Sequence, residues 1–347
     1  MTRPARWIPL LLACLVGLGL PPAQAGAAAR EPDAESIGIQ LLEAPVDRRG
    51  DPRALRYIVD HLPPGTVIRR QLLVVNKTTR TQRVDLYAAA ATLEEGRFRF
   101  GEGRTQNELS SWISLDRDRV ELPPGGQARV RATLDVPPPA SKGERYAVIW
   151  ASTKSPPKKS ANVNQVHRVG VRVYLDIGIG GEPPSSFTIG EVVPARDAQG
   201  VPSVSIRVEN TGGRALDLGG TVSLSEGPAG MRAGPFDVIE GTTLAPGTSG
   251  TVGVRFPREL PNGPWKIDIE LQSGTVRQTG TGRISFPDPG EVGEPSTLFG
   301  PLSTRWGILG ASLAVGLLVA GGLFLVARRT HRRRKAGTED PVASRPS

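Results

Sequence analysis

Apolar and polar residues alternate along most of the middle of the chain. Segments 203–209 and 266–271 have an apolar side chain at every second position, and segment 129–136 does the same with Val130, Ala132, Leu134 and Val136. A period of two with one apolar face predicts a strand in a half-buried sheet. Residues 26–304 show no helical period. The pattern therefore predicts an all-β body.

Two stretches of this body repeat the same order of turns. In each, a strand stops at a turn that contains an asparagine, Asn76 in the first and Asn210 in the second. A Pro/Gly turn comes later, at 122–125 and at 244–247, and leads into an alternating strand. This spacing predicts two tandem immunoglobulin-like β-sandwiches, which we expect over residues 26–180 and 181–286.

The N-terminus has the layout of a secretory signal peptide. Arg3 and Arg6 precede an apolar run that ends at Leu20, and residues 23–25 form a small-x-small cleavage site. We therefore predict a signal peptide over residues 1–25 that is cleaved after Ala25. A lipoprotein cleavage box ending at Cys14 is the alternative, since residues 11–14 read Leu-Leu-Ala-Cys.

A second apolar run, residues 306–327, carries no charge. A helix of this length rises about 1.5 Å per residue and crosses a hydrocarbon core of about 30 Å. The basic tail 328–347 follows, and positive charge beside a span stays cytoplasmic. We predict a single-pass cell-membrane protein with a C-terminal transmembrane α-helix, a cytoplasmic C-terminus and extracellular N-terminal domains. Four prolines indicate an extended stalk at 287–305.

Small residues recur every four positions along the predicted span, at Ser312, Gly316 and Ala320. A face of small side chains allows two helices to approach closely in a membrane. The sequence therefore predicts a helix-packing seam, through which the protein would form a homodimer.

The formal net charge of +9 raises the question of nucleic acid binding. The tail 328–347 alone holds seven basic and two acidic residues, and the signal peptide adds two arginines. The excess is thus mainly a topology signal, and we expect no nucleic acid partner. Residues 30–180 hold 24 basic and 18 acidic residues (24 − 18 = +6), and residues 181–304 hold 9 and 14 (9 − 14 = −5). The first half is therefore suited to an anionic polymer. The alternative is that +6 is the ordinary solubility charge of a domain of this size.

The sequence contains no recognisable catalytic or metal-binding motif. Its one cysteine, Cys14, lies in the signal peptide, and its histidines are His61, His167 and His331. Carboxylates at 116–121 alternate with arginines and lack the glycine of a calcium loop. No Gly-x-Ser-x-Gly elbow, phosphate loop or dinucleotide fingerprint is present. We expect a protein that is not an enzyme and has no catalytic residues, cofactor or metal.

Two segments are candidates for ligand binding. Segment 97–100 alternates cations with aromatic rings, which suits an anionic sugar polymer: Arg97, Phe98, Arg99 and Phe100. The alternative is that both rings point into the core and both arginines point outward. Segment 154–168 is a long basic loop that contains Lys158 and Lys159. It is either a binding loop or a flexible tip.

Six phrases occur in order in the first half: 57–65 (YIVDHLPPG), 74–78 (VVNKT), 87–92 (YAAAAT), 110–113 (SSWI), 120–125 (VELPPG) and 143–150 (GERYAVIW). Residues 37–179 in this way resemble the extracellular N-terminal domain of WxL-interacting proteins of Gram-positive bacteria. The resemblance implies an Ig-like peptidoglycan-binding domain. In that family a second Ig-like domain, assigned to host-surface binding, comes next. Residues 187–286 match this second domain only in architecture and position.

Together these features predict a non-enzymatic, single-span bacterial cell-surface protein. Its Ig-like domains would bind the cell wall (peptidoglycan or a wall glycopolymer), another surface protein, or both. The alternative is a membrane-anchored accessory or sensor subunit of an envelope complex, in which the transmembrane seam and the basic tail would matter most.

Overall fold

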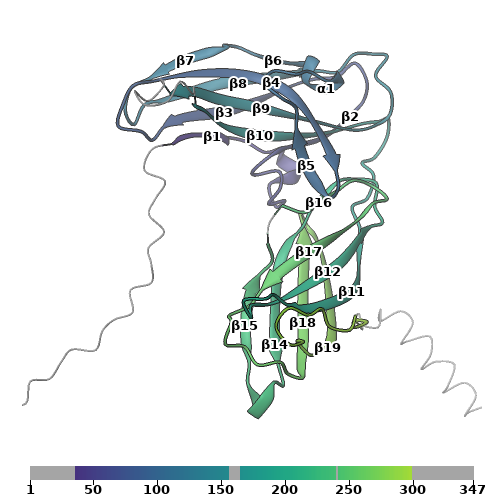
Figure 1. The fold of residues 1–347 in the computed structure, drawn as a ribbon. Coiled ribbons are helices and arrows are strands. Elements are labelled where there is room, and N and C mark those ends of the chain that lie inside the picture. The colour runs from purple at the N-terminus through teal and green to yellow at the C-terminus, as the bar shows by residue number, and fades with distance from the viewer. Residues whose placement is uncertain (1–35, 156–164, 240, 299–347) are drawn as a thin grey trace, which may run out of the picture.

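The computed structural model describes residues 36–155, 165–239 and 241–298 (Figure 1). The helical elements of the described residues are three short turns, η1 (Val46–Arg48), α1 (Glu108–Ser111) and η2 (Pro228–Gly230), and the other regular elements are strands. The predicted all-β body is thus confirmed for the described residues. None of the helices found there has the length and apolar character needed to span a membrane.

Several predictions fall on residues that the structure does not describe. These are the signal peptide with its cleavage site, the membrane span with its small-residue seam, the cytoplasmic tail and the tip of the basic loop. The residues concerned are Ala25, Lys158, Lys159, Ser312, Gly316 and Ala320.

The first unit contains two sheets with a core between them. One sheet has the order β1-β3-β8-β6, and the other has the order β2-β10-β9-β4-β5 with β7 beside β4. Strands β2 and β10 are parallel and the other pairs are antiparallel. The strands are β1 (Ile37–Leu41), β2 (Ile58–Leu62), β3 (Val67–Asn76), β4 (Gln82–Glu94), β5 (Arg97–Phe100), β6 (Ile113–Leu115), β7 (Arg119–Leu122), β8 (Gln127–Asp135), β9 (Gly143–Ser155) and β10 (Gln165–Ile177).

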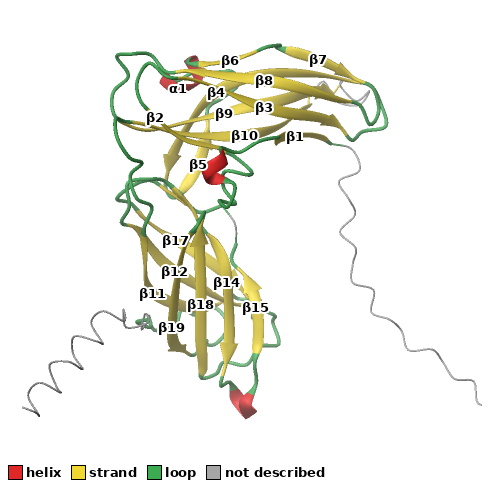
Figure 2. Cartoon of the chain, turned by 180° about the vertical axis from the view of Figure 1, so that it is seen from behind, coloured by secondary structure: helices red, strands yellow, loops and turns green. Residues whose placement is uncertain are grey.

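The second unit has its own sheets and its own core. Its sheets have the orders β11-β12-β17 and β15-β14-β18-β19, and β13 pairs with β16. The strands are β11 (Phe187–Arg196), β12 (Pro202–Asn210), β13 (Leu216–Asp217), β14 (Gly219–Ser225), β15 (Ala233–Asp237), β16 (Thr243–Leu244), β17 (Ser249–Arg255), β18 (Trp265–Ser273) and β19 (Val276–Ile284). Figures 1 and 2 show the first unit lying across one end of the second, so that the two form an L.

The alternation read from the sequence decides which side chains enter the cores. The predicted segments 129–136, 203–209 and 266–271 coincide with β8, β12 and β18. Their apolar positions are buried, as Val130, Ile206 and Ile269 illustrate with exposures of 1%, 0% and 2%. The period-two pattern thus correctly predicts both the strand and the side that faces the core.

The repeated asparagines have the same role in both units. Asn76 and Asn210 are fully buried at the ends of β3 and β12. The Asn76 side-chain amide donates to the Leu122 carbonyl at 2.9 Å, and that of Asn210 donates to the Leu244 carbonyl at 3.0 Å. Each asparagine therefore ties the end of one strand to the Pro/Gly turn of another. We call this arrangement the asparagine clamp.

Residues 287–298 do not form the expected extended stalk. They fold back beside β11, where Val192 and Ser296 exchange two backbone hydrogen bonds of 2.9 and 2.8 Å. The Leu298 side chain packs over Gly280 and Gly282 of β19. The open edge of β11 offers backbone donors and acceptors to any extended segment, whatever its side-chain pattern. The stalk prediction is therefore wrong for these residues, and residues 299–305 lie outside the described chain.

We expect Asn76→Ala and Asn210→Ala each to destabilise the protein. Each substitution leaves buried carbonyls without a donor, which costs about 1–3 kcal/mol per site. The urea unfolding midpoint of the full-length protein should fall in both variants. Gln106→Ala, at an exposed position with no side-chain hydrogen bond within the described structure, is the control and should leave it unchanged. Equal midpoints for all variants and the wild type would contradict the asparagine clamp.

Candidate binding surface and the junction between the units

The β4–β5 hairpin connects the two units. Residues 91–94 of β4 pair with β5, while the earlier part of β4 pairs with β9 and β7. Glu95 and Gly96 form the two-residue turn with φ values of 49° and 68°, as the right-handed twist of a hairpin favours. The Gly96 carbonyl accepts a hydrogen bond of 2.8 Å from the Thr243 amide of the second unit. The hairpin tip is thus fastened to the second unit.

The predicted ligand-binding residues of β5 separate in the structure. Phe98 is only 7% exposed, and its ring centroid lies 5.2 Å from that of Tyr174. It packs in the junction and does not face solvent, so the expectation that Phe98 contacts a ligand is wrong. Phe100 is 39% exposed, and Arg97 and Arg99 are exposed on the opposite side of the strand. The alternative, with rings inward and arginines outward, therefore describes Phe98 fully and Phe100 in part.

A buried ion pair joins the first unit to the second. The Arg214 guanidinium donates to Glu144 at 2.9 Å, and the two side chains are 1% and 3% exposed. The other Glu144 oxygen accepts from the Ala215 amide at 2.7 Å and from the Tyr146 hydroxyl at 2.9 Å. Arg214 also pairs with Glu182, in the segment between the units. Both charges thus have several partners, as burial of an ion pair requires.

In a second cluster at the junction the charges are reversed: the second unit supplies the anion and the first unit supplies the cations. Asp217 of the second unit accepts hydrogen bonds from Arg53 at 2.8 Å and from the Tyr174 hydroxyl at 2.8 Å. Thr243 and Arg172 also donate to Asp217, at 2.9 and 3.2 Å. Each unit therefore supplies both a cation and an anion, and this reciprocity fixes the orientation in which the units meet.

Burial keeps the junction tyrosines protonated. Desolvation, followed by the Glu144 carboxylate, raises the pKa of Tyr146 above its ordinary value of 10.0. Desolvation and then Asp217 raise the pKa of Tyr174 well above the same value. Both hydroxyls therefore remain protonated hydrogen-bond donors at neutral pH.

The junction also borders a cavity of about 740 Å³, lined by both units. Arg56, Tyr57 and Arg172 line it from the first unit, and Asp217 and Gln272 line it from the second. Arg53 lies at its wall, and its Nη2 atom has no hydrogen-bond partner in the described structure. Opposite charges meet in this cavity, where Arg172 and Asp217 form an ion pair of 3.2 Å.

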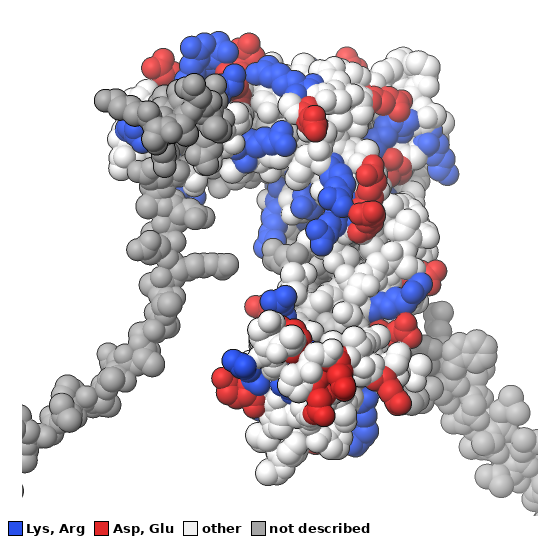
Figure 3. Space-filling view, in the orientation of Figure 1, with Lys and Arg blue, Asp and Glu red and all other residues white. Residues whose placement is uncertain are grey.

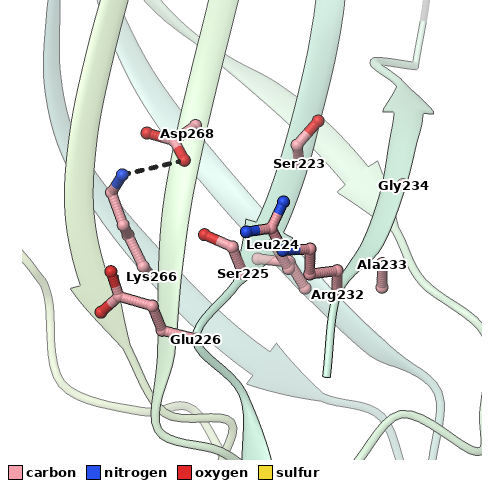
Figure 4. Close-up of a pocket in the computed structure, with 9 residues that line it drawn as sticks. All are labelled: Ser223, Leu224, Ser225, Glu226, Arg232, Ala233, Gly234, Lys266 and Asp268. Atoms are coloured by element: carbon pink, nitrogen blue, oxygen red, sulfur yellow. Dashed lines mark ion pairs between the residues drawn. The ribbon is translucent and has the colours of Figure 1, made fainter. Parts of the chain in front are cut away.

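A smaller pocket of about 460 Å³ lies on β14, β15 and β18 (Figure 4). Lys266 and Asp268 form an ion pair of 3.5 Å at its rim.

His61 of the first unit lies elsewhere, between Asp176 at 2.6 Å and the Gly180 carbonyl at 3.1 Å. Within residues 36–155, 165–239 and 241–298 no group of three His, Cys, Asp or Glu side chains is placed to hold a metal ion.

Comparison with known proteins leaves the family of this chain open. No family model matches it, and no curated protein does. Among solved structures it is similar to the class 5 fimbriae chaperone CfaA, with 15% identity, coverage of 70% of this chain and 98% of that chain, and a TM-score of 0.33. The YadV chaperone gives 10% identity, coverage of 72% and 99%, and a TM-score of 0.38.

The complex of the Salmonella enterica SafA pilin with the SafB chaperone gives 10% identity, coverage of 71% and 95%, and a TM-score of 0.38. At these TM-scores the likeness assigns no function to the present chain.

We expect Arg214→Ala to weaken the junction strongly. The substitution leaves Glu144 buried without its cation, which costs about 3–5 kcal/mol. The unfolding midpoint should fall, and limited proteolysis should cleave the 178–186 segment faster. Arg99→Ala is the matched control, because its pair with Glu95 is exposed and such pairs contribute about 0–1 kcal/mol. Equal proteolysis of the two variants would show that the junction does not depend on Arg214.

Proposed function

We propose that this protein is a non-enzymatic, single-span bacterial surface protein that binds another component of the cell envelope through two rigidly joined Ig-like β-sandwiches. The observation that carries the proposal is the buried junction, in which Glu144 pairs with Arg214 and Asp217 accepts four side-chain hydrogen bonds. A junction of this kind holds the surfaces of both units in one geometry, and such preorganisation lowers the entropic cost of binding.

The sequence features at the two ends support an extracellular location. A signal peptide over residues 1–25 and a span over 306–327 followed by basic residues would place both sandwiches outside the membrane. The likeness of residues 37–179 to WxL-interacting proteins supports the same placement and a wall or surface-protein partner.

The distribution of charge supports a binding role for the first unit. Figure 3 shows Lys and Arg side chains gathered on the first unit and around the junction, and acidic side chains frequent on the far part of the second unit. The first unit would therefore face an anionic partner, and the second unit would be held away from it.

Photo-crosslinking in intact cells tests this proposal on the full-length protein. A benzophenone amino acid replaces Phe100, Leu55 or Val292, which are 39%, 57% and 72% exposed. We expect crosslinks from Phe100 or Leu55 of the first unit to an envelope protein or to wall fragments. Crosslinks only to cytoplasmic proteins, or no crosslink to any envelope component from all three positions, would contradict the proposal. A crosslink from Val292 to a transporter or signalling subunit would favour the accessory-subunit alternative.

A further inference from the structure

The outer side of the sheet β2-β10-β9-β4-β5 carries aromatic rings and arginines. Its inner side packs into the first core, so the residues between those core positions point outward. The strand register places Trp150 of β9 between Tyr87 of β4 and Gly170 of β10. The β4–β5 hairpin brings Phe100 to the same place, where its ring meets that of Trp150 edge-on at 4.9 Å.

Trp150 lies flat on the sheet because β10 has a glycine beside it. A Cβ atom on Gly170 would lie 2.7 Å from the Trp150 ring, closer than any side chain allows. The absence of a side chain at Gly170 thus lets the indole spread across two strands. Trp150 is consequently 5% exposed although it lies on the outer side of the sheet.

Two guanidinium groups cover these rings from the solvent side. The Arg168 guanidinium lies 4.5 Å from the Trp150 ring centroid, and that of Arg104 lies 4.5 Å from the Tyr87 ring centroid. A guanidinium that stacks on a ring uses its face and leaves its N–H edges available for hydrogen bonds. The rings therefore hold two planar cations in fixed positions at the surface.

The edges of these cations have little to bind within the protein. Arg168 is exposed and has no carboxylate partner among the described residues. Arg104 is 58% exposed, and its nearest carboxylate, Asp85, is 3.9 Å away and also pairs with Arg119 at 2.8 Å. The indole N–H of Trp150 is buried and has no acceptor in the part of the chain that the structure describes. The face thus presents donors in excess of acceptors.

We propose that this arginine–aromatic face, formed by Tyr87, Phe100, Arg104, Trp150 and Arg168, binds a phosphate-bearing wall polysaccharide. The inference rests on the proposed function and names the ligand class. Guanidinium edges match phosphate oxygens in bidentate pairs, and the exposed part of Phe100 offers a ring surface to the C–H groups of a sugar.

The face presents two cations on neighbouring strands. Arg104 stacks on Tyr87 of β4 and Arg168 on Trp150 of β9, and Tyr87 and Trp150 are register partners. A chain with repeating negative charges can contact both cations at once. The net charge of +6 over residues 30–180, from 24 basic and 18 acidic residues, adds long-range attraction for the same polymer.

The test uses the full-length protein in detergent micelles and a purified phosphodiester-linked sugar polymer as the probe. We expect wild-type protein to bind this polymer and to release it as salt increases. The Arg104→Gln/Arg168→Gln double variant should bind about tenfold more weakly or worse, because two charge-assisted contacts are lost. Arg129→Gln/Arg131→Gln is the matched control, since both arginines are exposed on β8 of the opposite sheet. The control should bind as the wild type does.

Three further probes separate the sources of binding. Neutral dextran should not bind, and inorganic polyphosphate and vesicles of anionic lipid should bind more weakly than the sugar polymer. Phe100→Ala should weaken binding of the sugar polymer and leave polyphosphate binding unchanged. Unfolding midpoints equal to that of the wild type show that the variants are folded.

Several outcomes would overturn the inference. They are equal weakening in the double variant and its control, absence of wild-type binding to the sugar polymer, and equal or tighter binding of polyphosphate or of lipid vesicles. If envelope crosslinks persist while the double variant binds the sugar polymer as its control does, the proposed function stands and this site is removed. If none of the three benzophenone variants gives an envelope crosslink, the proposed function itself is removed.

Discussion

The buried pairing of Arg214 with Glu144 is the interaction on which the shape of this molecule depends. Two charges that are 1% and 3% exposed must be paired, because either one alone would be buried without compensation. The pair forms only when the start of β9 and the segment before β13 meet in one orientation. Asp217 constrains the same orientation with the charges reversed, because this anion belongs to the second unit and its donors Arg53 and Tyr174 belong to the first.

Hydrogen bonds to backbone groups close each sandwich. The asparagine clamp ties a strand end to a distant turn in both units. In the second unit, residues 287–298 also cover the edge of β11. Backbone pairing of this kind protects an open strand from pairing with another chain. The two units therefore have stable frames on which exposed side chains can be placed accurately.

The strands of the first unit also position the residues of the proposed binding face. Trp150 lies flat because Gly170 has no side chain, and Phe100 reaches it because β5 pairs with β4, the neighbour of β9. The tip of the same hairpin bonds to the second unit through Gly96 and Thr243. The junction and the face are thus linked by the β4–β5 hairpin. Phe98 packs into the junction, while Phe100, two residues later, completes the face.

The sequence by itself determined the strands, the sides of β8, β12 and β18 that face the cores, and the repeated asparagine turns. These are local properties, since a period of two decides which side chains can be buried together. Only the tertiary structure decided that Phe98 meets Tyr174, that Arg214 meets Glu144 and that residues 287–298 return to β11. Such contacts join residues that are far apart in the chain. They depend on how sheets and units meet, which no local pattern of polar and apolar residues encodes.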